Sequence, residues 1–279
     1  MKQGASFYSF AQDVNVEEAM RICGKAGYDG VEPVLSENGY LNMKSSDADV
    51  LRIGRLAREN GLEIPSVGVW SLWEYNLASN DPARRRTAED IVKKQLEVAS
   101  ALGADTVLVV PGSVGNDFSQ TPEFVRYDIA YDRVQESLSG LAAYARAAGV
   151  CIGIENVWNR FLLSPIELRR FIDEIGSEFV GAYFDVGNIL YIGYPDQWID
   201  ILGPRIKKIH FSDYRAGQAG LGAFVDLLAG DVDFAAVMAA LRRIGYNGYV
   251  TLEMLPNYKE FPYVSMFANK HAMDAIVKL

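Results

Sequence analysis

A glycine that closes a helical stretch, followed within a few residues by a short apolar run, recurs seven times along this chain. Glycine just past a helix reaches left-handed backbone angles at no steric cost, so each occurrence predicts a helix end followed by a strand. A further apolar segment near residues 4–10 brings the predicted number of strands to eight. The junction glycines are Gly27, Gly61, Gly103, Gly149, Gly176, Gly203 and Gly245.

The predicted strands are short and continuously apolar, as in Thr106–Val110, which is typical of parallel strands buried on both faces. Helical periodicity marks the segments between them, and Pro82 and Pro165 stand where a first helical turn would begin. Eight strand–helix units in 279 residues give about 35 residues per unit. We therefore predict an α/β fold: a single (β/α)8 TIM-barrel domain over residues 1–279, with the active site at the C-terminal ends of the strands. A doubly wound sheet is the alternative, but the chain lacks the GxGxxG and GxxxxGKS/T loops that such a sheet would use.

Charge and composition narrow the classes of partner. The net charge of −9 argues against a nucleic-acid partner, because affinity for a phosphate backbone comes from clustered Lys and Arg. No apolar run approaches the roughly 18 residues that a membrane span needs, so no membrane partner is expected. Two cysteines are too few for a disulfide framework or a zinc ribbon. The first ten residues lack the basic flank and apolar stretch of a secretory signal, and we predict a cytoplasmic protein.

Four consecutive predicted strands end in a residue that can bind a metal ion. The gaps between these residues each correspond to about one strand–helix unit, so the four side chains would meet at a common centre. Three carboxylates and one imidazole favour Mn²⁺, Mg²⁺ or Co²⁺ with room for substrate oxygens over a closed thiolate zinc site. A single acidic residue at a strand end is more often a helix cap or an ion-pair partner, but four in register fit that interpretation poorly. The candidate ligands are Glu155, Asp185, His210 and Glu253.

Other aromatic, basic and histidine side chains are open to more than one interpretation. Four aromatic side chains could wall a sugar pocket, or they could form a hydrophobic lid or a subunit contact in a homo-oligomer: Trp70, Trp73, Tyr75 and Trp158. The three arginines at 84–86 are predicted to lie on the solvated face of a helix. His271, the second of the two histidines, is predicted to lie on the surface or in the packing of the last helix.

Four segments resemble the xylose-isomerase-like TIM-barrel sugar isomerases and epimerases, nearest the ketose 3-epimerases and sugar-phosphate epimerases. They read GIENVWNRFLLSP (153–165), FDVGN (184–188), IHFSDYR (209–215) and TLEM (251–254). The resemblance implies that the four candidate ligands hold one divalent metal, with Mn²⁺ expected and Co²⁺, Mg²⁺ or Zn²⁺ as alternatives.

The same resemblance implies roles for individual residues. Glu155 and Glu253 would be the catalytic acid/base pair, and Glu32 and Arg215 would lie near the substrate. D-tagatose 3-epimerase-like members carry a histidine three residues after the strand-six aspartate, where this chain has Asn188. Asn188 and Trp70 complete the candidate substrate-binding set.

These residues predict a metal-dependent epimerase or isomerase of a small-molecule sugar or sugar phosphate. A metal-bound hydroxyketone has a polarised carbonyl, which lowers the barrier to loss of the neighbouring proton by several kcal/mol. One carboxylate would take that proton and leave an enediolate. A second carboxylate on the opposite face could return a proton and invert the centre, whereas return to the neighbouring carbon would interconvert an aldose and a ketose.

Three other functions are weighed against this prediction. A keto-inositol (inosose) dehydratase-type lyase would share the metal and the first proton abstraction. An endonuclease IV-like metallohydrolase is disfavoured by the negative charge and the shortage of histidine. A non-catalytic binding protein is disfavoured by the intact set of candidate ligands.

Overall fold

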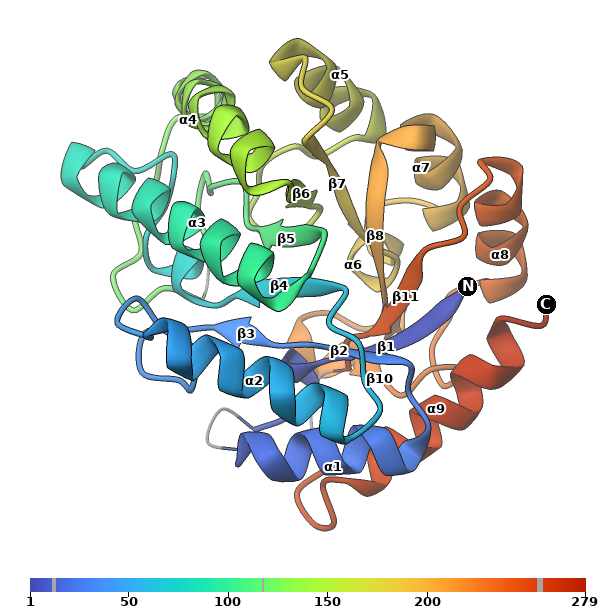
Figure 1. Cartoon of the computed structure of the whole chain (residues 1–279). Coiled ribbons are helices and arrows are strands. Elements are labelled where there is room, and N and C mark those ends of the chain that lie inside the picture. Colours follow the sequence, from blue (N-terminus) through green and yellow to red (C-terminus); the bar gives the residue numbers. More distant parts are fainter. Residues whose placement is uncertain (12–13, 117, 255–257) are drawn as a thin grey trace.

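The computed structural model describes residues 1–11, 14–116, 118–254 and 258–279. A ring of helices surrounds a central sheet of parallel strands (Figure 1). After strand β8 the chain forms a small antiparallel ribbon of β9 (Asp213–Tyr214) and β10 (Phe224–Val225). The strands of the central sheet are β1 (Lys2–Ser6), β2 (Gly30–Glu32), β3 (Val34–Leu35), β4 (Ser66–Val69), β5 (Thr106–Val109), β6 (Cys151–Glu155), β7 (Val180–Asp185), β8 (Ile206–Phe211) and β11 (Tyr249–Leu252).

The sheet closes into a barrel through the segment that holds β2 and β3. The strand order is β2-β1-β11-β8-β7-β6-β5-β4-β3, with β2 paired to β1 and β3 paired to β4. Only Pro33 separates β2 from β3, and its carbonyl accepts a hydrogen bond from the Gly68 amide of β4. The two short strands therefore occupy one position in the wall, and the predicted (β/α)8 TIM-barrel fold is confirmed.

The helices begin and end where the local sequence provides caps. All seven junction glycines adopt a positive φ, from 54° at Gly203 to 89° at Gly27, as the sequence predicts. Ser164 caps the helix that begins at Pro165, and Asp81 caps the one that begins at Pro82. The α-helices are α1 (Val16–Ala26), α2 (Asp47–Glu59), α3 (Pro82–Leu102), α4 (Tyr127–Ala148), α5 (Pro165–Ile175), α6 (Gly187–Leu190), α7 (Pro195–Leu202), α8 (Phe234–Arg243) and α9 (Val264–Ile276).

The bounds of two strands follow from single residues at their ends. The first strand ends at Ser6 and not at residues 8–10, because the Ser6 hydroxyl accepts a hydrogen bond from the Tyr8 amide and starts the 3-10 turn η1 (Phe7–Ser9). Strand β4 begins at Ser66, directly after Pro65, which has no amide to donate to a neighbouring strand.

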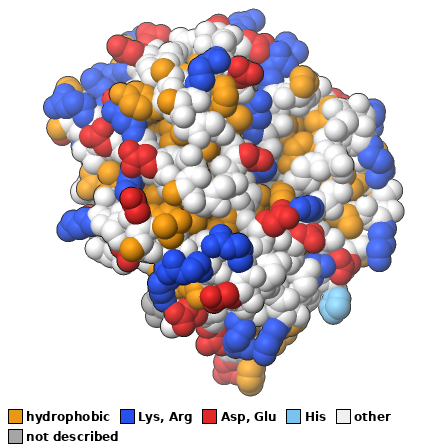
Figure 2. Space-filling view, viewed as in Figure 1, with side chains coloured by type: hydrophobic (Ala, Val, Ile, Leu, Met, Phe, Trp, Pro, Cys, Tyr) orange, Lys and Arg blue, Asp and Glu red, His pale blue; other side chains and the backbone are white. Residues whose placement is uncertain are grey.

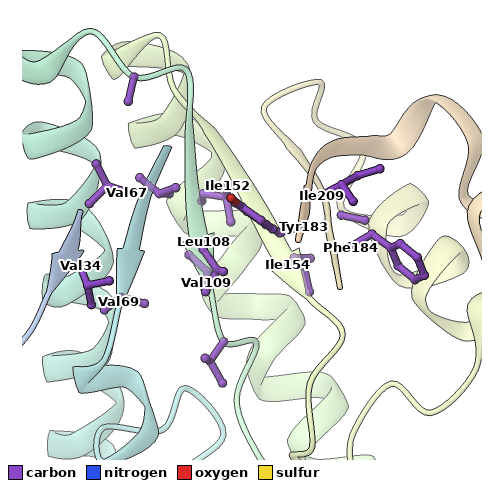
Figure 3. Close-up of a cluster of buried hydrophobic side chains, with 14 of the residues drawn as sticks. Val34, Val67, Val69, Leu108, Val109, Ile152, Ile154, Tyr183, Phe184 and Ile209 are labelled. Carbon is purple, nitrogen blue, oxygen red and sulfur yellow. The ribbon is translucent and has the colours of Figure 1, made fainter. Parts of the chain in front are cut away.

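Successive side chains along each strand point alternately outward to the helices and into the barrel, so they form two layers. Apolar side chains from β3 to β8 form a buried cluster that includes Val67, Ile152 and Ile209 (Figure 3). Phe184 of β7 stacks on Trp198 of α7, so it points outward to the helices. The next residue back, Tyr183, points into the barrel. This inward direction brings polar side chains of non-adjacent strands together beneath the site described below.

Acidic and basic side chains are interspersed over the face shown in Figure 2. His271 lies exposed on α9, which agrees with its predicted surface position. None of the helices in the described part of the chain is long and apolar enough to cross a membrane.

Candidate active site

Three of the four predicted ligands meet at the C-terminal end of the barrel. Glu155 is the last residue of β6, His210 lies in β8, and Glu253 directly follows β11. One potential ligand atom from each lies within 4.8 Å of the others. Backbone pairing fixes this convergence, because the Glu253 amide donates to the Phe211 carbonyl at 3.0 Å and continues the β11–β8 ladder.

The atoms at the centre of this group lack hydrogen-bond partners. His210 Nδ1 lies 2.5 Å from Glu253 Oε2, yet the contact does not have hydrogen-bond geometry, and both atoms are buried without a partner among the described residues. A buried polar atom without a partner is costly, and a cation between an imidazole nitrogen and two carboxylates would satisfy all of these groups. The donor set therefore fits a divalent metal ion, although it is compatible with several such ions.

Asp185, the fourth predicted ligand, lies beside this group and outside it. The Ser212 hydroxyl lies 2.8 and 2.9 Å from its two carboxylate oxygens, and the backbone amide of Asn188 donates to one of them at 2.6 Å. Asn156 fixes the Asp185 backbone with two hydrogen bonds, of 2.8 and 2.9 Å. Asp185 lines the same pocket as Glu155 and Glu253, but in this structure its oxygens face Ser212 and Asn188.

Glu32 lies beneath His210 and away from the pocket. Its Oε1 is 2.9 Å from His210 Nε2 and accepts a hydrogen bond from the Ser6 hydroxyl at 2.8 Å. Its Oε2 accepts from the hydroxyls of Ser66 at 2.7 Å and Tyr183 at 2.5 Å. Glu32 is fully buried, so its position favours orienting the imidazole over touching a substrate.

Burial and neighbouring carboxylates raise the pKa values of Glu155 and Asp185. Burial, and then the charge of Glu253, raise the pKa of Glu155 and bring that of Asp185 to about 7. Burial opposes protonation of His210, but the neighbouring Glu32 and Glu253 outweigh it and raise the pKa of this imidazole. Hydrogen bonds and the charge of His210 lower the pKa of Glu32 despite its burial. A divalent cation would supply the positive charge that this cluster of acids lacks.

An aromatic pocket opens above the three ligands. Trp70 and Trp73, from the segment after β4, and Trp158, from the loop after β6, line it, as the sugar-pocket interpretation predicts. Tyr75 is not among the residues that line it. Asn188 lines it as well, and its carbonyl accepts a hydrogen bond from the Trp158 indole at 3.1 Å. The residues that line the pocket are Tyr8, Trp70, Trp73, Phe118, Glu155, Val157, Trp158, Asp185, Asn188, Ser212, Leu221, Phe224 and Glu253.

Arg215, one of the predicted substrate-binding residues, lies outside the pocket. Its side chain is exposed and does not line the pocket, and its Nε donates to the Ala229 carbonyl at 3.3 Å. The backbone turns outward at this point, because the Arg215 amide pairs with the Ala223 carbonyl in the β9–β10 ribbon.

Several residues of the site were not predicted from the sequence. Ser212 stands in the segment HFSDY two residues after His210, where side-chain direction alternates and returns it to the pocket side. Tyr8 lines the pocket with its hydroxyl held by the Val69 carbonyl and amide, at 2.6 and 2.8 Å. Tyr183 and Ser66 sit inside apolar strands, so no local pattern distinguishes them from core residues.

Comparison with known proteins shows the family to which the chain belongs. Residues 20–267 match the family described as Xylose isomerase-like TIM barrel. The chain is 24% identical to a putative L-ribulose-5-phosphate 3-epimerase, SgbU, of Escherichia coli strain K12, over 96% of this chain and 93% of that protein. It is 23% identical to an inosose dehydratase of Lacticaseibacillus casei, over 96% of this chain and 92% of that protein.

Among solved structures, D-psicose 3-epimerase with D-tagatose from Clostridium cellulolyticum H10 has a similar fold. The TM-score is 0.81 at 18% sequence identity, and the match covers 99% of this chain and 98% of that chain. The relatives and structural neighbours that are named as ketose 3-epimerases are isomerases. The resemblance seen in the four sequence segments is confirmed, and the chain belongs to the Xylose isomerase-like TIM barrel family.

Proposed function

We propose that this protein is a divalent-metal-dependent epimerase or isomerase of a keto sugar, which moves a proton next to a carbonyl through an enediolate. The observation that carries the proposal is the group of Glu155, His210 and Glu253 beside an aromatic pocket, in which His210 Nδ1 and Glu253 Oε2 are buried without a hydrogen-bond partner among the described residues. The active site would thus lie at the C-terminal ends of the strands of one barrel domain spanning residues 1–279.

Glu155, His210 and Glu253 would hold the metal, and Asp185 would join them through a change in its hydrogen bonds to Ser212. When bound, a divalent cation acts as a Lewis acid that polarises a carbonyl oxygen and favours loss of the neighbouring proton. Mn²⁺ suits the carboxylate-rich donor set, and Co²⁺, Mg²⁺ and Zn²⁺ are alternatives.

The positions of the two glutamates in the barrel support roles on different sides of a substrate. Glu155 belongs to β6 and Glu253 follows β11, and β7 and β8 separate these strands in the sheet order. Their side chains therefore enter the pocket from different parts of the wall. If each carboxylate takes and returns a proton on its own side of one carbon, the configuration of that carbon inverts. If one carboxylate shuttles the proton to the neighbouring carbon, an aldose and a ketose interconvert.

The pocket favours an unphosphorylated substrate over a sugar phosphate. No Lys, Arg or His is among the described residues that line it, and positions 12–13, 117 and 255–257 carry none in the sequence. A phosphate dianion is normally held by cations or by the amides of a helix N-terminus. The aromatic rings instead suit the apolar face of a sugar ring or chain.

A dehydratase is the second candidate function. The chain resembles an inosose dehydratase along nearly its whole length. Abstraction of a proton next to a keto group begins both reactions, so the same glutamates would serve. The two functions differ in the step that follows, because a dehydratase expels water from the neighbouring carbon.

The proposed partners and location rest on the net charge and on the two cysteines. We propose a small-molecule substrate and neither a nucleic-acid nor a membrane partner, given the net charge of −9. Cys23 and Cys151 are both free thiols, which supports a cytoplasmic location.

A panel of ketoses, their phosphates and inososes tests the proposed function. The protein is stripped with a chelator, reloaded with Mn²⁺, Co²⁺, Mg²⁺ or Zn²⁺, and its products are followed by NMR. We expect epimer or aldose formation that disappears on chelation and returns with metal, and higher kcat/KM for an unphosphorylated ketose than for its phosphate. Glu178→Gln, in an exposed loop before β7, is the matched control and should keep parent activity. Full activity in protein shown to be metal-free by elemental analysis would contradict the proposal.

A further inference from the structure

One carboxylate ties together the two loops that form the aromatic wall of the pocket. Glu74 lies between η2 (Ser71–Trp73) and α3, and it accepts hydrogen bonds from the loop that follows β5. Its Oε2 accepts from the Ser119 hydroxyl at 2.8 Å and from the Gln120 amide at 3.1 Å, and its Oε1 accepts from the Thr121 hydroxyl. These bonds outweigh the effect of burial and lower the pKa of Glu74, so the carboxylate is charged at neutral pH.

Arg84 completes this arrangement from the first turn of α3. Its Nη2 donates to Glu74 Oε1 at 2.9 Å and also to the Glu74 carbonyl, and it reaches the Thr121 hydroxyl at 2.9 Å. The Arg84 side chain is only 23% exposed. The prediction of a solvated arginine is therefore wrong for Arg84, because the guanidinium is held between the two loops. We call Glu74, Arg84 and the three contacted residues 119–121 the loop clamp.

The loop clamp lies directly beside two pocket residues. Trp73 precedes Glu74 and Phe118 precedes Ser119, and their ring centroids are 4.5 Å apart. Both rings line the pocket. The contact between these rings joins the same two loops as the clamp, so a shift of the 118–121 segment would open the wall.

Among the described residues, the other hydrogen bonds between the segment after β4 and this loop lie nearer the ends of the loop. Asn76 exchanges hydrogen bonds with the Ser113 carbonyl and amide, both at 2.9 Å. Asn80 donates to the Phe124 carbonyl at 3.2 Å. Between these two anchors, the clamp connects the middle of the loop, next to Phe118, to the segment after β4.

We propose that Glu74 and Arg84 are positioning residues that hold the Trp73–Phe118 wall in place and thereby set how tightly the site binds its sugar. This inference rests on the proposed function. The clamp does not contact Glu155, His210 or Glu253, so its loss should weaken substrate binding and leave the proton transfer nearly intact. Removal of charged hydrogen bonds of this kind should raise KM about tenfold and change kcat less than about threefold.

Steady-state kinetics and hydrogen exchange together test the clamp. The variants are Glu74→Ala, Arg84→Ala and their double variant, with Glu74→Gln as the conservative replacement and Glu178→Gln as the control. We expect both alanine variants to raise KM and to speed amide exchange in residues 118–124, while Glu74→Gln lies between them and the parent. Because both residues belong to one hydrogen-bond network, the double variant should raise KM by less than the product of the two single effects.

The outcomes separate this inference from the proposed function. If the parent turns over no sugar with any metal, the proposed function fails, and the clamp is then judged by hydrogen exchange and by sugar-induced quenching of tryptophan fluorescence. Unchanged exchange in residues 118–124 in Glu74→Ala would overturn the inference. A fall in kcat with KM unchanged would also overturn it, because the clamp would then act on the reacting groups.

Discussion

Replacing Glu32 with glutamine tests whether the group beneath His210 prepares it to bind a metal ion. Glu32 is an acceptor for Ser6, Ser66, Tyr183 and His210 Nε2. A carboxylate at Nε2 keeps a proton there, which leaves the Nδ1 lone pair for the centre of the site. A glutamine side chain has only one acceptor oxygen. Its NH₂ group must therefore face either the His210 imidazole or the hydroxyls of Ser66 and Tyr183.

The size of the effect follows from this exchange of acceptor for donor. Loss of a partner that orients a metal ligand costs about 10–100-fold in metal affinity, or about 1.4–2.8 kcal/mol. The fold should survive, because the hydroxyls of Ser66 and Tyr183 can rotate to accept from the amide. Ser6→Ala removes one donor to Glu32 without touching the imidazole and should weaken metal binding by less than about threefold.

Calorimetric titration of Mn²⁺ into metal-free protein measures this effect, with thermal unfolding of the same samples as the control for stability. We expect Glu32→Gln to bind Mn²⁺ about 10–100-fold more weakly than Ser6→Ala or the parent. Unchanged Mn²⁺ affinity together with a lower melting temperature would refute the reasoning and leave Glu32 a purely structural residue.

Further predictions concern His210, Glu74 and the alternative function. His210→Ala removes the nitrogen ligand and should weaken Mn²⁺ binding by more than about 100-fold while circular dichroism shows retained helix; unchanged affinity would exclude His210 from the site. The pKa of Glu74 is lowered below 4.5 in the folded protein, so its contribution to stability is present above that pH and is lost as the pH falls through the lower, folded-state value. The melting-temperature difference between the parent and Glu74→Gln should therefore shrink below about pH 4, and a constant difference down to pH 2 would be inconsistent with this. An inosose should be a poorer substrate than a ketose, as measured by kcat/KM, and the reverse order would favour the dehydratase.

The architecture could be predicted because its signals are local. Each junction glycine marks a backbone conformation that other residues adopt at a cost, and the strands between them are apolar enough to be found individually. Their order along the chain then specifies a barrel, and the barrel places Glu155, His210 and Glu253 at one end.

The finer parts of the site depend on side-chain directions that no local pattern encodes. Asp185 ends its strand as predicted, but Ser212 and the Asn188 amide turn its carboxylate away from the other ligands. Glu32 points beneath His210 because strands β2 and β8 meet across the barrel interior. Arg215 leaves the pocket because the β9–β10 ribbon begins just before it.

Deuterium wash-in from heavy water tests the central claim most directly, namely that Glu155 and Glu253 move protons on opposite sides of one carbon. Each metal-loaded variant, Glu155→Gln and Glu253→Gln, is incubated with each epimer of an accepted ketose, and exchange is followed by NMR and mass spectrometry. We predict that both variants stop interconversion of the epimers, while each still exchanges the proton of one epimer, a different one in each variant. Glu178→Gln should behave as the parent. Interconversion at the parent rate in metal-loaded Glu253→Gln would contradict the account and leave Glu253 a metal ligand alone.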